Sequence, residues 1–295
     1  MKNQILTSLG LNWEIQKFPL SVNFVAEDGT EHQYDKGGHY GIVRMDNKEI
    51  LATCKESYTA IQNSETIDLL FDISQRENLE IQKGGEIDGG KKIFVQMKDP
   101  NGDIQIGKDT LSKYIFAINS HDGSTSLAFG TSNLTWSCQN QFFKFYRRSQ
   151  IKVRHTSNYQ GKLQEALRVL ELGKQNDEVE LYSALKEFAQ VQIKEENIRT
   201  LILSLEGVDL AEGDFKNKEI HSTNKLNKVN KLLDSIHSEM DSKGKSLWGL
   251  FSGVTYFTNH IEPAYKRVNG LEEKLILGGS YQKNLKAFEL VSEML

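Results

Sequence analysis

The sequence predicts an α+β protein with an antiparallel, β-rich N-terminal half that carries one packed helix, followed by an all-α C-terminal half. In residues 18–130 apolar side chains alternate with a period of two, whereas after Thr131 they recur every three or four positions. Strands do not alternate singly with helices, which argues against a Rossmann or TIM fold. We therefore expect a β-hairpin platform over residues 1–130 and a helical region over residues 131–295, continuous with the platform.

Four hairpin-like units are expected in the first half. Their turns lie at Asp28-Gly29, Asp46–Lys48, Asp88–Gly90 and Asp122-Gly123. Asp-Gly is a strong hairpin signal, because glycine adopts positive φ without steric cost. One helix is expected between the second and third hairpins, where Ile61, Ile67, Leu70 and Phe71 follow helical spacing.

The second half is expected to be helical throughout. A helix is predicted over residues 132–148, where Leu134, Cys138, Phe142 and Phe145 are three or four positions apart, with Ser132 or Asn133 as the N-cap. The further predicted helices cover short amphipathic stretches within 159–207, a long polar stretch over 216–240, the most hydrophobic stretch over 246–263 and a last one over 280–295.

The composition limits the classes of function. The 295 residues carry a net charge of −4 and are 38% hydrophobic, as in an ordinary globular protein. No apolar run approaches the ~18 residues that span a bilayer, and the N-terminus lacks a secretory pattern, so we expect a cytoplasmic protein without membrane contact. Cys54 and Cys138 have no ligand pattern around them, so no disulfide scaffold, metal or cofactor is expected.

Positive charge is concentrated in residues 141–168, where seven Lys and Arg residues face one Glu. This segment therefore carries +6 and the rest of the chain −10. Aromatic residues are interleaved with the basic ones, as in proteins that hold single strands by phosphate contacts and base stacking. The residues expected to contact nucleic acid are Lys144, Tyr146, Arg147, Arg148, Lys152, Arg154 and Tyr159. The alternative is a solvated basic face above core positions at Phe142 and Phe145.

The glycine-rich stretch 84–92 ends in Lys91 and Lys92, which are a candidate second wall of the nucleic-acid site. It is not a P-loop, because residues 93–95 continue as a strand instead of opening a helix. A plain glycine-rich hairpin turn remains the alternative.

The stretch Asn-Ser-His-Asp-Gly-Ser at 119–124 also has two interpretations. One is a tight hairpin turn, and the other is a functional site in which His121 or Asp122 acts as a general base or a metal ligand. No second His or Cys stands at a ligand spacing, and His155 is 34 residues away. The chain has no nucleophile-elbow, zinc-protease, paired-acid or Walker pattern.

Residues 119–124, Cys138–Asn140 and the His155-Thr156 pair form an ordered series. The series resembles the phage/plasmid-like proteins that carry domain of unknown function 932, over roughly residues 38–262. We expect Asn119, His121, Asp122, Cys138, Asn140 and His155 to form a polar cluster of unknown role. The family's occurrence in phages, plasmids and integrated elements implies work in DNA replication, recombination or host defence.

The favoured function is binding of single-stranded DNA or RNA, with strand annealing in recombination or replication. Homo-oligomer formation is expected by analogy with ring-forming annealing proteins. One alternative is a non-catalytic factor that contacts a host or phage protein, such as an inhibitor of host defence. The other is a nucleic-acid-processing enzyme that uses His121, Asp122 and His155 with a divalent metal.

Overall fold

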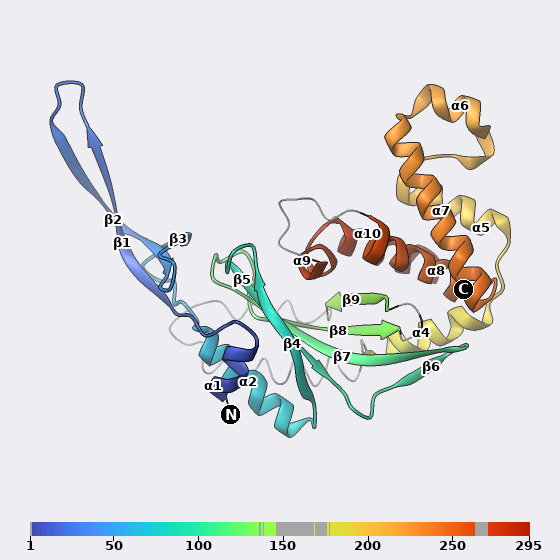
Figure 1. Cartoon of the computed structure of the whole chain (residues 1–295), viewed down its shortest axis with the longest axis horizontal. Coiled ribbons are helices and arrows are strands. Elements are labelled where there is room, and N and C mark those ends of the chain that lie inside the picture. The colour runs from blue at the N-terminus through green and yellow to red at the C-terminus, as the bar shows by residue number, and fades with distance from the viewer. Residues whose placement is uncertain are drawn as a thin grey trace. The chain divides into compact units, whose positions relative to one another are not determined.

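A computed structural model of the chain describes residues 2–135, 137, 139–145, 168, 176, 178–262 and 271–295. The predicted fold class is confirmed, because strands dominate the first half and helices the second (Figure 1). The described residues form two compact units. The described residues of the first unit are 2–100, 115–130, 145 and 168, and those of the second are 101–114, 131–135, 137, 139–144, 176, 178–262 and 271–295.

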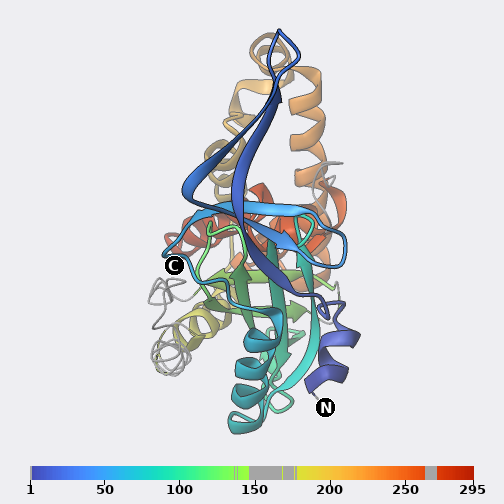
Figure 2. The ribbon, with the colours of Figure 1, turned by 90° about the vertical axis from the view of Figure 1, so that its left-hand side faces the viewer.

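The first unit opens with α1 (Lys2–Ser8) and a three-stranded sheet in the order β1-β2-β3. The strands are β1 (Ile15–Val25), β2 (Glu31–Arg44) and β3 (Ile50–Lys55), and both pairings are antiparallel. Gly29 has a φ of 84° at the β1–β2 turn, so the predicted Asp28-Gly29 hairpin is confirmed. Because β3 pairs only with His39–Val43 of β2, the other end of β1 and β2 is a two-stranded arm (Figure 2).

A second sheet has the strand order β4-β5-β7-β8-β9, with β6 paired to β7. Its strands are β4 (Glu80–Ile87), β5 (Lys92–Lys98), β6 (Ile104–Ile106), β7 (Asp109–Ser120), β8 (Ala128–Thr135) and β9 (Gln141–Phe145). The β4–β5 turn passes through Asp88, Gly89 and Gly90, all at positive φ, as the glycine-rich sequence predicts. The short strand β6 was not among the predicted elements.

Helix α2 (Asn63–Arg76) is the predicted helix of the first half, and it supplies the core of the first unit. The backbone N–H of Gln62 donates to the Glu65 carboxylate at 2.8 Å, a capping interaction that fixes the start of the helix. Its buried apolar side chains, with Ile67 and Leu70 fully enclosed, belong to the same cluster as Ile93, Val95 and Met97 of β5.

The second unit is mostly helical. Its helices are α4 (Val179–Gln190), α5 (Glu195–Glu206), α6 (Gly213–Ile220), α7 (Thr223–Lys243), α8 (Leu247–Tyr256), α9 (Leu271–Ile276) and α10 (Gly279–Ser292), with short turns η2 (Leu210–Glu212) and η3 (Phe257–Ile261). The side chains of Ser222 and Ser246 cap α7 and α8 by accepting backbone N–H groups. None of the described helices has the length and apolar character needed to cross a bilayer.

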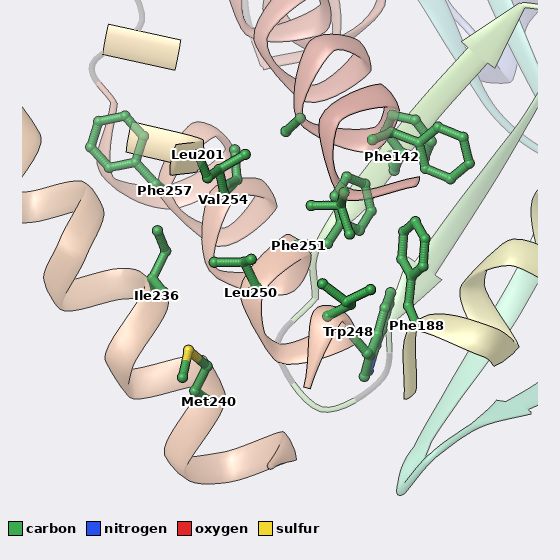
Figure 3. Close-up of a cluster of buried hydrophobic side chains, with 14 of the residues drawn as sticks. Phe142, Phe188, Leu201, Ile236, Met240, Trp248, Leu250, Phe251, Val254 and Phe257 are labelled. Carbon is green, nitrogen blue, oxygen red and sulfur yellow. The ribbon is translucent and has the colours of Figure 1, made fainter. Parts of the chain in front are cut away.

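Aromatic side chains form the centre of the second unit's core. Figure 3 shows Phe142 of β9, Phe188 of α4 and Phe251 of α8 turned toward one another. The ring centroids of Phe142 and Phe251 are 5.2 Å apart in an edge-to-face arrangement. Helices α7 and α8 approach closely at Gly253, where an added Cβ would lie 2.4 Å from the Cα of Ile236. Glycine is therefore required at this contact.

The helix predicted over residues 132–148 is wrong for the part of that range that the structure describes, 132–135 and 139–145. Strand β8 continues to Thr135 and β9 begins at Gln141. Between them Gln139 has a φ of 54°, and the N–H of Thr135 donates to the carbonyl of Asn140 at 3.0 Å. The helical spacing of the apolar residues is therefore a coincidence across a tight turn between two short strands.

Candidate functional site

The Asn-Ser-His-Asp-Gly-Ser segment ends β7 and turns the chain toward β8. Gly123 adopts a φ of 71°, and Asp122 Oδ1 accepts the N–H of Ser124 at 2.9 Å. Ser120 Oγ accepts the N–H of Thr125 at 3.1 Å and donates to the carbonyl of the same residue. The segment is thus a turn closed by its own side chains, as the turn interpretation predicts.

The His121 side chain is fully buried in the first unit. Its Nε2 lies 2.8 Å from Oδ1 of Asn63, the first residue of α2. The Asn63 amide donates in turn to the carbonyl oxygens of Leu11 and Trp13, at 3.2 Å each. The Trp13 and His121 rings meet edge to face with centroids 5.4 Å apart. His121 therefore ties the start of α2 to the chain that enters β1.

The backbone of His121 contacts two further segments of the chain, at Tyr58 and Lys91. We call Trp13, Tyr58, Asn63, Lys91 and His121 together the His121 cluster. The N–H of His121 donates to the Lys91 carbonyl at 2.7 Å, which joins the glycine-rich turn. The Tyr58 hydroxyl donates to the His121 carbonyl at 3.4 Å, and burial raises the pKa of this tyrosine. Nearby, Asn119 donates to Thr66 at 3.2 Å.

Two ion pairs lie beside the His121 cluster, where the β4–β5 turn meets the turn between β7 and β8. Lys92 Nζ lies 3.1 Å from Asp122 Oδ2, and both side chains are mostly buried. Burial raises the pKa of Asp122, but the hydrogen bonds from Ser124 and Lys92 and the charge of Lys92 outweigh it, so the pKa lies below its ordinary value. Lys91 pairs with Asp88 at 3.0 Å on the surface, and the Asp88 carboxylate raises the pKa of this lysine.

The contacts of the His121 cluster join four segments of the first unit, and they leave the His121 ring buried. A general base has to come within hydrogen-bond reach of a substrate proton, and His121 has no exposed surface. Among the described residues, no group of three or more His, Cys, Asp or Glu side chains is placed to hold a metal ion. The Asp122 carboxylate, the one acidic group of the motif, is mostly buried and is paired with Lys92.

Asn140, another member of the predicted polar cluster, belongs to the second unit, and its hydrogen-bond partners lie in the same unit. Its amide donates to the Ser252 carbonyl at 3.2 Å, and its Oδ1 lies 3.0 Å from Nε2 of His260. Next to it, Asn259 exchanges two hydrogen bonds of 3.1 Å with the backbone of Gln141. These contacts hold the start of β9 against α8 and η3. Cys138 and His155, the remaining predicted members, lie outside the described residues.

A buried charge cluster in the second unit was missed by the sequence reasoning. Asp109 Oδ2 accepts from Lys243 Nζ at 2.7 Å and from the indole N–H of Trp248 at 2.8 Å, and its Oδ1 accepts from Ser137. Glu239 lies 3.3 Å from the same lysine. Burial raises the pKa of Asp109, but these donors together hold it below its ordinary value. Residues 246–263 were predicted as a helix, but nothing in that stretch pointed to Asp109.

The first residues of the basic segment lie in β9. Phe142 and Phe143 are buried, which confirms the core interpretation for Phe142, and Phe145 packs edge to face on Phe116 at 4.9 Å. Lys144 Nζ lies 4.6 Å from the centre of the Phe288 ring. The other predicted contacts, Tyr146, Arg147, Arg148, Lys152, Arg154 and Tyr159, lie outside the described residues.

A family model described as Domain of unknown function (DUF932) matches residues 50–276, most of the chain. The chain belongs to the DUF932 family. No curated protein and no solved structure matches it.

The DUF932 match begins at the first residue of β3, so α1, β1 and β2 precede it. It includes His121, Asn63 and Asp109, and it ends at the last residue of α9. Trp13, which packs on His121, comes from outside the matched part of this DUF932 protein.

Proposed function

We propose that the protein binds single-stranded nucleic acid in the cytoplasm through its basic segment, residues 141–168, and that it aligns strands of phage or plasmid DNA for annealing. One observation carries the proposal. Residues 141–168 hold seven basic side chains and one acidic one, in a chain whose other residues sum to −10. Such separation of charge favours a polyanionic ligand at one place on the protein.

Contacts within the protein already engage some of the proposed basic residues, which favours the others as phosphate contacts. Lys92 is neutralised by Asp122 at 3.1 Å, and Lys144 is held over the Phe288 ring. Lys91 forms an exposed pair with Asp88, which competes weakly because surface pairs contribute about 0–1 kcal/mol. We therefore assign the principal contacts to Arg147, Arg148, Lys152 and Arg154, with Lys91 as a secondary one.

Binding of this kind is electrostatic and indifferent to sequence. Neutralising about four phosphates on a single strand gives a log-log salt slope near −3, at ~0.7 per contact. Stacking of a base on Tyr146 or Tyr159 contributes roughly 1–3 kcal/mol. The segment has no set of side chains typical of base reading in a groove, so oligonucleotides of different sequence bind with similar affinity.

The test is fluorescence anisotropy with a labelled single strand of about 30 nucleotides, long enough for several stacked bases, at a series of salt concentrations. The Arg147→Ala/Arg148→Ala variant should flatten the salt slope by about 1.4, since it removes two contacts of ~0.7 each.

Lys186→Ala/Arg199→Ala is the matched control, because it removes the same charge from exposed positions on α4 and α5. It should bind like the wild type. Equal loss in both variants would reduce the effect to net charge, and the absence of binding by the wild type at low salt would overturn the proposal. Annealing is read separately, from the rate at which two complementary labelled strands pair.

A further inference from the structure

The distal half of the β1–β2 arm has an apolar face that no other described part of the chain covers. Val22 and Phe24 of β1 lie opposite Tyr34 and His32 of β2, so the four side chains share one face. Val22, Phe24 and Tyr34 are 57%, 48% and 59% exposed. The Phe24 ring stacks on Tyr34 at 5.7 Å and on His32 at 5.2 Å. These contacts order the face without burying it.

A two-stranded ribbon without a covered face is at best marginally stable in water. From residue 21 to residue 38, all but Ala26 and His32 are exposed. Such a long, exposed, apolar strand edge is a site for pairing with another chain. The open edge of the arm can therefore pair with a further strand, which would extend the ribbon into a larger sheet.

The two edges of the arm differ in charge. Ser21–Val25 on β1 carries no charged side chain, and β1 is the terminal strand of its sheet in the order β1-β2-β3. The distal part of β2 carries Glu31, Asp35 and Lys36. A strand pairs with its own copy without repulsion only where like charges do not face each other. The β1 edge meets this condition.

We propose that two copies of the chain associate through the β1 edges of their arms, paired antiparallel about a twofold axis at Asn23. This joins the two hairpins into a four-stranded sheet. In this register Val22 of one copy lies opposite Phe24 of the other, and Ser21 lies opposite Val25. Val22 and Phe24 of both copies then share one face, as the period of two requires, and Ser21, Asn23 and Val25 share the other. The proposal is independent of nucleic-acid binding.

Charge argues against nucleic acid as the partner of this face. The end of the arm holds Glu27, Asp28, Glu31 and Asp35 against Lys36, so a phosphate backbone would be repelled. The face itself carries His32 as its one titratable group apart from the Tyr34 phenol. The β1 edge at Ser21–Val25 carries no charge and is complementary to itself, so it fits an isologous contact.

The experiment is sedimentation equilibrium of the full chain over a series of protein concentrations, with Asn23→Lys as the disrupting variant. The substitution places two lysines opposite each other across the axis, so we expect self-association to weaken by about tenfold or more, equivalent to at least 1.4 kcal/mol. Gln33→Lys is the matched control, since Gln33 is the exposed residue paired with Asn23 on β2, one strand farther from the edge. It should leave self-association within about twofold of wild type.

An equal mixture of Asn23→Lys and Asn23→Glu should restore a dimer, because opposite charges then face each other. Recovery of the dimer would also show that both variants fold. A monomeric wild type at every concentration, a dimer insensitive to Asn23→Lys, or equal weakening by Gln33→Lys would each overturn the proposal.

Discussion

Substituting Asp109 by Asn should destabilise the second unit strongly. The change removes the charge from the centre of the buried cluster while keeping the side chain's shape. Lys243 is left with the Glu239 carboxylate at 3.3 Å in place of the direct 2.7 Å bond to Asp109. The exposed fractions of the Lys243 and Asp109 side chains are 3% and 5%, so water does not replace the lost partner.

Removing one member of a buried ion pair typically costs about 3–5 kcal/mol. Two features place Asp109→Asn near the lower end of this range. Glu239 still offsets part of the lysine charge, and an Asn Oδ1 can still accept the Trp248 indole N–H. We expect a loss of about 3 kcal/mol in the free energy of unfolding. For Asp109→Ala the indole N–H also loses its acceptor, which adds about 1–3 kcal/mol.

Urea denaturation followed by tryptophan fluorescence measures the loss, since Trp248 lies within the cluster. Asp72→Asn is the control, because Asp72 forms an exposed pair with Lys2 at 3.4 Å, and it should cost no more than about 1 kcal/mol. A double-mutant cycle with Lys243→Met should show that the two losses do not add. Equal, small losses for Asp109→Asn and Asp72→Asn would refute the reasoning.

Two further predictions concern the same unit. Gly253→Ala should destabilise it by about 1–3 kcal/mol, because the new Cβ meets the Ile236 backbone, whereas Gly279→Ala, with open space around it, should be neutral or stabilise by up to about 1 kcal/mol; urea midpoints compare the two, and equal effects would contradict the close-packing argument. Burial raises the pKa of Glu262, but the contacts with Lys283, Lys228 and Ser280 outweigh it, so the pKa lies below its ordinary value. The stabilisation by Glu262 should therefore be complete above pH ~5 and be lost as the pH falls through the depressed pKa. The difference in unfolding free energy between wild type and Glu262→Gln, measured from pH 7 down to about pH 3, should therefore shrink toward the acid end; a difference that stays constant would mean that the carboxylate charge contributes nothing.

Local signals in the sequence predicted much of the fold. The Asp-Gly turns at 28–29 and 122–123 and the helix around Ile67 and Leu70 follow from residue types a few positions apart. The same reasoning failed at 132–148, because Leu134 and Phe142 belong to two strands joined by a turn at Gln139, whose positive φ no sequence rule indicated.

The site was less predictable because its contacts are distant in sequence. His121 was identified, but its partner Asn63 stands 58 residues earlier. Lys243 and Asp109 are 134 residues apart, and neither has a distinctive neighbour in the sequence. Periodicity reports which face of an element is buried, and it does not report which polar side chains meet across the fold.

The start of the family match does not coincide with a boundary between structural units. The match begins with β3, yet Leu11, Trp13, Ile15 and Ile42 lie before it and belong to the buried cluster of the first unit. The Asn63 amide is also satisfied by two backbone carbonyls from this preceding stretch. A chain that began at residue 50 would expose one edge of β3, open the core beneath α2 and leave the Asn63 amide without its two acceptors. Residues 2–49 are therefore integral to the unit that contains the matched sequence, and a truncation intended to isolate the family domain has to retain them.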